Sequence, residues 1–283
     1  MTSSDSLPMA KRPIEDVPGH WLLARLGKRV LRPGGKELTR FLIRNAGIPG
    51  GDVVELAPGL GKTAQLIVAE GPRTYVGVDE DASAVAYTQK RLAGGDSASN
   101  SAPKTNVKSV EAKSIEVKNA AASDTGCDGN SKDVVIGEAM LTMQGDKGKH
   151  AIVDEASRIL RSGGRYAIHE LCIEPDTLSD EDKTNIRKAL ARSIKVNARP
   201  LTTAEWSQLL EEHGFRVEKI EHAPMHLLKP RRNIQDEGLL RSLKILFNVV
   251  RQPGARRRVL AMRKVFNQYS DNLAAIAIIA VKD

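Results

Sequence analysis

Short apolar runs alternate with longer amphipathic segments between residues 52 and 171 of this 283-residue chain. Of all features of the sequence, this alternation restricts the possible folds most strongly. Runs rich in valine and isoleucine predict buried strands, whereas apolar residues three to four apart predict helices. We expect strands at residues 53–56, 74–78, near the end of 107–117, 133–136 and 165–171, and helices at 63–70, 82–92 and 147–160. The alternation predicts an α/β fold in which helices cover both faces of a mostly parallel sheet.

Two helices precede this region, and two helices, two strands and a basic helical insertion follow it. Their expected positions are residues 21–31 and 36–46 before the region, then 179–195, 204–212, 215–220, about 236–267 and 273–281. The two late strands bring the sheet to seven strands. We therefore expect a flexible tail at residues 1–18, a helical cap at 19–47 and a main domain at 48–283, with its insertion at about 230–268.

The composition excludes several classes of protein. The hydrophobic fraction of 41% suits a globular protein, and the longest apolar run, residues 273–281, is shorter than the ~20 residues of a membrane-spanning helix. The N-terminus has no apolar signal-peptide core, and Cys127 and Cys172 do not have metal-type spacing. We expect a cytoplasmic protein without a membrane span, a disulfide framework or a metal site.

The chain is basic, with a formal net charge of +8, and part of this excess lies in its C-terminal third. The cations there are Lys229, Arg231, Arg232, Arg251, Arg256, Arg257, Arg258, Arg263 and Lys264. A basic surface can contact nucleic acid, anionic lipid or an acidic substrate, but a solvated helix face is the commoner case. No strand with interleaved aromatic residues accompanies these charges, so we do not expect a nucleic-acid partner.

A glycine-rich turn lies between the first strand and the first helix of the alternating region. Gly59 and Gly61 allow the backbone to turn sharply and approach a ligand, and the following helix directs its N-terminus toward that ligand. The next strand ends at Asp79 and Glu80, where a carboxylate can accept hydrogen bonds from ribose hydroxyls. The turn and the acid together predict a nucleoside-binding site at the carboxyl edge of the sheet.

Two phosphate-binding motifs share features with this turn. A P-loop requires a glycine where the chain has Leu56, and Pro58 lacks the backbone donor that a phosphate cradle uses. The glycine spacing, with Ala64 in the third place, does fit a dinucleotide-binding turn. However, the carboxylate of Glu55 just before the turn suits an ammonium group better than a pyrophosphate. S-adenosylmethionine carries an ammonium and a sulfonium but no phosphate.

The segment from Glu55 to Gly61 resembles the first motif of class I S-adenosylmethionine-dependent methyltransferases, an acidic residue followed by a glycine-rich turn. The resemblance implies a Rossmann-like fold and S-adenosylmethionine as the cofactor. It also implies that Asp79 binds the ribose, and that Asn119 lies beside the adenine where family members usually have an aspartate. The implied cofactor-binding residues are Glu55, Ala57, Pro58, Gly59, Gly61, Asp79, Glu80, Asn119, Ala120 and Glu138.

Later segments are similar to the branch of this family that includes the ubiquinone/menaquinone, tocopherol and sterol methyltransferases. The similar segments are residues 133–139, 158–164 and 201–215, and the whole resemblance covers roughly residues 52–215. Residues 21–35 and the insertion after Pro224 resemble features of a bacterial subgroup.

The resemblance implies transfer of a methyl group from S-adenosylmethionine to a small-molecule acceptor. Glu138 and His169 end the fourth and fifth strands, at the edge where ligands bind, and are the candidate catalytic residues. The alternatives are a buried acid paired with a nearby arginine for Glu138 and a structural histidine for His169. An RNA methyltransferase that uses the basic helices, an NAD-dependent oxidoreductase and a binding module without turnover are the alternatives. The sequence Gly137-Glu-Ala-Met140 replaces the Asn/Asp-Pro-Pro-Tyr/Phe motif of base-directed methyltransferases, which disfavours RNA.

Two further groups of residues each allow two interpretations. The cluster of Arg29, Arg32 and Pro33-Gly34-Gly35 either folds over the cofactor as a lid or only ends a helix. Met140, Met143 and Met225 either line an apolar acceptor pocket or fill the core.

Overall fold

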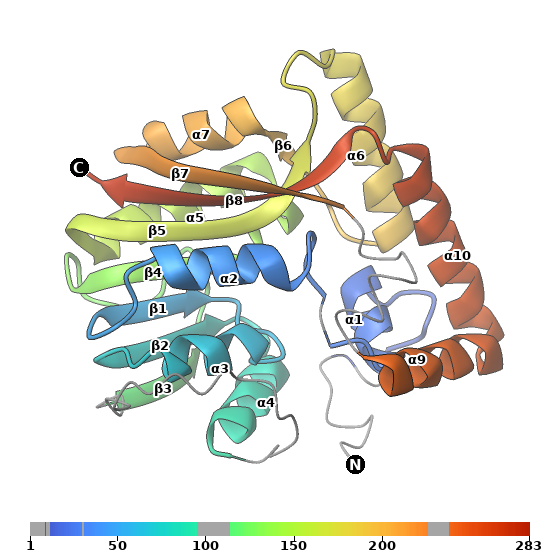
Figure 1. Ribbon diagram of the computed structural model, residues 1–283, viewed down its shortest axis with the longest axis horizontal. Coiled ribbons are helices and arrows are strands. Elements are labelled where there is room, and N and C mark those ends of the chain that lie inside the picture. Colours follow the sequence, from blue (N-terminus) through green and yellow to red (C-terminus); the bar gives the residue numbers. More distant parts are fainter. Residues whose placement is uncertain (1–8, 10–11, 30, 95–113, 226–237) are drawn as a thin grey trace.

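The computed structural model describes residues 9, 12–29, 31–94, 114–225 and 238–283 (Figure 1). Within these residues, an eight-stranded sheet has the order β3-β2-β1-β4-β5-β8-β7, with β6 beside β5. Its strands are β1 Asp52–Leu56, β2 Thr74–Asp79, β3 Ser114–Asn119, β4 Lys132–Glu138, β5 Leu160–Ile173, β6 Leu201–Thr202, β7 Phe215–Pro224 and β8 Leu273–Lys282. Among these described strands, only β8 pairs antiparallel with its neighbours, β5 and β7. The predicted mostly parallel α/β sheet is confirmed, and β6 adds a two-residue strand that we did not expect.

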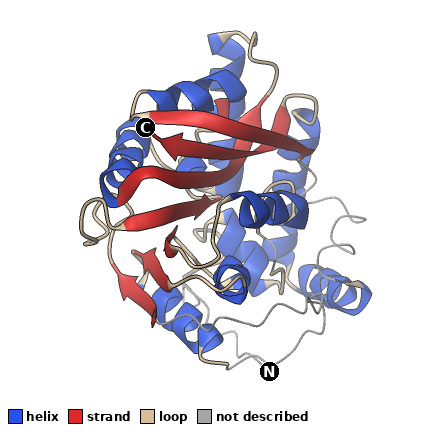
Figure 2. Cartoon of the chain, turned by 60° about the vertical axis from the view of Figure 1, so that its left-hand side comes forward, coloured by secondary structure: helices blue, strands red, loops and turns tan. Residues whose placement is uncertain are grey.

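Helices cover both faces of this sheet, as Figure 2 shows. They are α1 Gly19–Arg25, α2 Lys36–Asn45, α3 Lys62–Ala69, α4 Ala82–Leu92, η2 Leu141–Met143, α5 Asp146–Ile159, α6 Asp180–Ile194, α7 Thr203–Glu211, α9 Leu239–Arg251 and α10 Pro253–Gln268. Apolar residues of α2, α3 and α4 form the core on one face, and those of α5 and α7 form the core on the other.

Neighbouring residues of each buried strand contribute to opposite faces of the sheet. In β1, Val53 packs with α2 and α3, whereas Val54 packs with α5. In β8, Ile276 and Ala277 divide between the two cores in the same way. Because both faces are covered, such strands are apolar almost throughout, and this is the pattern that made them predictable from the sequence.

The N-terminal segment and the C-terminal insertion pack against each other beside the sheet (Figure 1). Leu22 of α1 lies in a buried cluster with Ala255 and Met262 of α10. The side-chain amide of Asn248 in α9 donates to the carbonyl of Leu26, at 3.0 Å. No helix in the described parts of the chain is both long and apolar enough to cross a membrane.

The N-terminal region differs in two respects from its sequence-based expectation. The first helix ends at Arg25 and not at Leu31, because Gly27 adopts a positive φ of 104°, which interrupts the helix. Val17, expected within a flexible tail, is fully buried against the insertion helices. Residues 1–8, 10–11, 30 and 226–237 lie outside the described part of the chain, and the division into tail, cap and main domain stays a prediction.

Candidate active site

A cleft of about 320 Å³ lies where β1, β2 and β4 end. Parallel strands end at the same edge of a sheet, so Glu55, Asp79 and Glu138 all line this cleft. The N-terminal segment also lines it, through His20 and Arg32 among others. Arg29 and Arg32, from the cluster with two interpretations, both line the cleft, and the function of this cluster as a lid stays a prediction.

The glycine-rich turn after β1 forms part of the cleft wall and is held by α4. Gly59 and Gly61 have φ values of 56° and 64°, in the left-handed region that glycine adopts without strain. The Thr88 hydroxyl donates to the Gly59 carbonyl at 3.1 Å, and the Arg91 guanidinium donates to the Leu60 carbonyl at 2.6 Å. These contacts from α4 fix two carbonyls of the turn.

Two alanines at the cleft also adopt the left-handed conformation. Ala57 follows β1 with φ 54°, and Ala139 follows β4 with φ 56°. This conformation costs a non-glycine residue ~1–2 kcal/mol, and such backbone strain clusters at functional sites. Both residues keep their strand pairing, because Ala57 N–H donates to Val78 and Ala139 N–H donates to His169, each at 2.7 Å. Ala57 stands where the related motif has its first glycine, and its φ gives the physical reason for that glycine.

Asp79 connects the turn to the residues after β2. Its carboxylate accepts hydrogen bonds from Gly59 N–H at 3.1 Å and from Asp81 N–H at 3.0 Å. Burial raises the pKa of Asp79, although these two backbone hydrogen bonds oppose the shift. The Gly59 amide, a donor that a bound phosphate would use, is therefore already engaged by a carboxylate.

Glu55 is a buried acid in the wall of the cleft. Only 2% of the residue is exposed, and the Tyr75 hydroxyl donates to its Oε2 at 2.6 Å. Gly77 makes room for this hydrogen bond, because a Cβ there would lie 2.9 Å from the Tyr75 hydroxyl. Burial raises the pKa of Glu55 to about 8, and the neighbouring charge of Glu138 adds to the shift, whereas the Tyr75 hydrogen bond opposes it.

Glu138 gathers polar groups from several elements around one carboxylate. Arg32 of the N-terminal segment forms an ion pair with it, and the hydroxyls of Thr39 in α2 and Thr63 in α3 donate to it. Burial opposes ionisation of Glu138, but the charge of Arg32 and the hydrogen bonds of His169 and Thr39 outweigh it and hold the pKa well below its usual range. Glu138 is thus an ionised carboxylate that fixes the segment between α1 and α2 to the sheet.

His169 lies beneath this segment and is completely buried. Its Nδ1 is 2.7 Å from Oε1 of Glu138, and its Nε2 is 2.7 Å from the carbonyl oxygen of Pro33. Both ring nitrogens are therefore engaged, and the residue does not line the cleft. This geometry does not suit the catalytic role that we predicted for His169, and it suits a role in positioning Glu138 and Pro33.

Asn119 and Ala120 lie beside the cleft and are not part of its lining. The Asn119 side-chain amide donates to the carbonyls of Asp79 and Glu80, at 2.9 and 2.8 Å. Ala120 N–H donates to the Asp79 carbonyl at 3.2 Å. Asn119 thus joins the ends of β2 and β3, while Ala122 contributes to the cleft wall in this region.

Some cleft residues were not predicted from the sequence, His20 and Trp21 among them. Both line the cleft, with their ring centroids 5.0 Å apart, and burial lowers the pKa of His20 to about 4. They precede the alternating strands, so no local motif marked them. Met140 and Met143 also line the cleft, although Met140 belongs to a buried core cluster as well, and Met225 packs against another core cluster at α6. Within the described residues, no cluster of three or more histidine, cysteine, aspartate or glutamate side chains could hold a metal ion.

Comparison with known proteins identifies both a domain and a relative. Residues 54–168 match the methyltransferase domain family. Over 269 residues the chain is 33% identical to an uncharacterised protein of Haemophilus influenzae, covering 95% of this chain and 99% of that protein. The chain belongs to the same family as this protein. The region that matches the methyltransferase domain family extends from β1 into β5, and thus contains Glu55, Asp79 and Glu138.

Two solved structures have the same fold as this chain. The MccD protein aligns with a TM-score of 0.64 and 19% identity, over 89% of this chain and 99% of that chain. Phosphoethanolamine N-methyltransferase 2 of Haemonchus contortus, in complex with S-adenosyl-L-methionine, aligns with a TM-score of 0.64 and 19% identity, over 93% of this chain and 56% of that chain. These alignments confirm the predicted Rossmann-like fold. S-adenosylmethionine, the predicted cofactor, agrees with the methyltransferase domain.

Proposed function

We propose that the chain transfers a methyl group from S-adenosylmethionine to a small-molecule acceptor. The observation that carries this proposal is the pair of carboxylates, Glu55 and Asp79, that line one cleft at the ends of the paired strands β1 and β2. Glu55 would bind the cofactor's ammonium group, and Asp79 would accept hydrogen bonds from its ribose hydroxyls. The glycine-rich turn between them allows the nucleoside to approach the backbone.

Three features of the cleft fit this cofactor. A bound ammonium would restore the ionised form of Glu55, whose pKa is about 8 without it. The Nε of Arg32 is buried without a hydrogen-bond partner among the described residues, and it would offer a donor to the cofactor's carboxylate. The Gly59 amide already donates to Asp79, which disfavours the pyrophosphate of NAD.

When bound, S-adenosylmethionine supplies an activated methyl group, and the protein has to align the acceptor and exclude water. Met140 and Met143 offer adaptable apolar surface in the cleft, and Trp21 adds an aromatic one. These side chains suit an apolar acceptor, as the resemblance to the ubiquinone, tocopherol and sterol branch also implies. His20 is neutral at pH 7 because burial lowers its pKa, so its ring can orient an acceptor by a hydrogen bond.

Glu138 and His169 would act on this reaction as positioning residues. Arg32 and the Pro33 carbonyl belong to the segment between α1 and α2, and Glu138 and His169 connect that segment to the end of β4 and to the interior of β5. Since Arg32 also lines the cleft, this connection would keep its guanidinium in place for the cofactor.

Calorimetric titration with S-adenosylhomocysteine tests the cofactor site. We expect Glu55→Ala and Asp79→Ala each to weaken binding at least tenfold, or ~1.4 kcal/mol, because each removes a charge-assisted hydrogen bond. Glu70→Ala, at the exposed end of α3, is the matched control and should bind as the wild type does. Unchanged affinity in both cleft variants would remove these carboxylates from the cofactor site.

Two further measurements test the reaction and its rival. Incubating the purified protein with cell extract and methyl-labelled S-adenosylmethionine should yield a labelled small molecule in mass spectrometry. In a thermal-shift assay, S-adenosylhomocysteine should raise the unfolding temperature and NADH should not, because only a ligand that binds the folded state stabilises it. Stabilisation by NADH alone would favour the oxidoreductase alternative.

A further inference from the structure

The outer face of α9 carries a row of exposed apolar side chains. Six of the ten exposed large apolar residues in the described parts of the chain lie on this helix, between 54% and 84% exposed. They are Leu239, Leu240, Leu243, Leu246, Phe247 and Val250, and we call them the apolar stripe. Single exposed apolar residues are ordinary, but a contiguous group on one helix face is typical of an interaction surface.

The stripe is a true outer face, because α9 is attached through its other side. Ile245 is 8% exposed, and Asn248 donates to the Leu26 carbonyl at 3.0 Å. Arg241 reaches the Gly27 carbonyl at 3.5 Å. At 100° per residue, these three contact residues fall on the side of the helix opposite the centre of the stripe.

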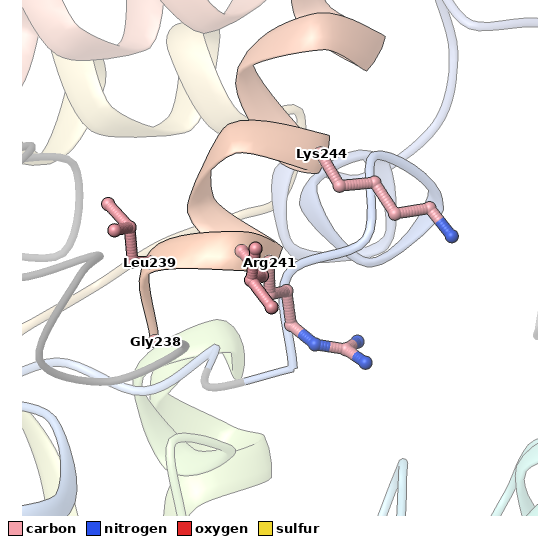
Figure 3. A pocket seen from close by; sticks show the side chains of 5 residues that line it. Gly238, Leu239, Arg241 and Lys244 are labelled. Atoms are coloured by element: carbon pink, nitrogen blue, oxygen red, sulfur yellow. The ribbon is translucent and has the colours of Figure 1, made fainter.

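Cations border the stripe on α9 and continue on the next helix. Lys244 and Arg251 are exposed and lie along one edge of the stripe by helical spacing. Figure 3 shows the Lys244 side chain extending away from the helix axis at the start of α9. The exposed cations of α10 are Arg256, Arg257, Arg263 and Lys264.

The charge of the chain is concentrated in these two helices. Residues 239–268 contain eight lysines and arginines and no aspartate or glutamate. The rest of the chain has 35 cationic and 35 acidic residues, so its formal charge is zero and the two helices account for the whole net charge of +8. A surface of this kind attracts a partner that is apolar and anionic together.

We infer that α9 docks the protein on an anionic lipid surface. The apolar stripe would lie at the boundary between headgroups and acyl chains, and Lys244 and Arg251 would contact the anionic headgroups. A helix with a face of large apolar residues and cations beside that face is a form that lies in a membrane interface. A second copy of the chain fits less well, because it would bring two helices with the same cations together.

Co-sedimentation with lipid vesicles tests this inference without reference to methyl transfer. The full chain should bind vesicles that contain phosphatidylglycerol at least tenfold more strongly than vesicles of phosphatidylcholine alone, at an ionic strength near 0.1 M. Raising the salt should weaken this binding, because it screens the attraction to the headgroups. Equal or absent binding to the two kinds of vesicle would overturn the inference.

Matched variants locate the surface. Leu243→Glu with Phe247→Glu should lower binding to the anionic vesicles at least tenfold. The control pair, Leu66→Glu with Ile115→Glu, adds the same two negative charges at two exposed apolar residues outside α9. It should bind the anionic vesicles as the wild type does. Lys244→Gln with Arg251→Gln leaves the apolar stripe intact, and it should lower binding to phosphatidylglycerol vesicles several-fold. Circular dichroism checks that each variant folds. If Leu243→Glu with Phe247→Glu fails to fold, Lys244→Gln with Arg251→Gln provides the test.

Two outcomes would assign the surface differently and so refute lipid docking. The first is a concentration-dependent dimer in light scattering that Leu243→Glu with Phe247→Glu abolishes, together with no vesicle binding. The second is an equal loss of vesicle binding in the control pair Leu66→Glu with Ile115→Glu, which would make the effect one of net charge alone.

Discussion

Glu55 couples cofactor binding to the release of a proton, and its pKa sets the size of the coupling. Burial raises this pKa to about 8, so the side chain is mostly protonated at pH 6 and at pH 7. Its ionised fraction rises about tenfold between these two values. Because an ammonium group binds the ionised form, we expect the affinity for S-adenosylhomocysteine to rise about tenfold, or ~1.4 kcal/mol, from pH 6 to pH 7.

Calorimetric titration at the two pH values measures this coupling directly. Repeating each titration in two buffers of different ionisation enthalpy counts the released protons, and we expect close to one per bound ligand at pH 6. Glu55→Gln is the control, since its amide cannot ionise, and it should bind more weakly with little change between the two pH values. Equal wild-type affinity at both pH values, or an unchanged pH dependence in Glu55→Gln, would refute the reasoning.

The same carboxyl affects stability in the absence of ligand. Its folded-state pKa of about 8 lies above the ordinary value near 4.3, so the folded state keeps a proton that the unfolded state releases. The stabilising effect is complete below about pH 4 and is lost as the pH rises toward 8. Urea unfolding at pH 5.5 and pH 7.5 should therefore show a steeper loss of stability for the wild type than for Glu55→Gln.

Three more variants test the packing around the cleft. Glu138→Ala leaves the buried guanidinium of Arg32 without its partner, and we expect it to lower the free energy of unfolding by about 3–5 kcal/mol in urea titration. Gly34→Ala should lower the thermal unfolding temperature more than Gly214→Ala. Both glycines have a positive φ, but only at Gly34 would an added Cβ lie 2.8 Å from a neighbouring side-chain atom. The hydrogen bond with Arg73 holds the pKa of Asp52 below its usual range, so the free energy of unfolding should decrease as the pH is lowered below about 4. This decrease should be smaller in Asp52→Asn than in the wild type.

The strands and helices of the methyltransferase domain were predictable because their signals are local. Buried parallel strands are short apolar runs, and α4, Ala82–Leu92, has the bounds that its sequence indicated. The gathering of Glu55, Asp79 and Glu138 was predictable for a second reason, since parallel strands place their carboxyl ends at one edge. Sequence alone thus located the cleft and its three acids.

The contacts that complete the cleft were not predictable, because they join distant parts of the chain. Arg32 and Glu138 are 106 residues apart, and no local pattern links them. His169 lies within β5, four residues before this strand ends at Ile173, and not at the strand end that we expected. Only the position of Pro33 shows that both its ring nitrogens are engaged. His20 precedes every strand of the sheet, so its place in the cleft depends on how the N-terminal segment folds back.

The interleaving of the two chain ends has a consequence for the order of assembly during synthesis. The β8 strand, near the C-terminus, lies between β5 and β7, and Arg258 of α10 donates to the carbonyls of Ile14 and Val17 at 2.6 Å. The ribosome releases these late residues only when translation is nearly finished. We therefore expect nascent chains stalled before residue 238 to hold S-adenosylhomocysteine poorly, although every strand of the methyltransferase domain has already emerged.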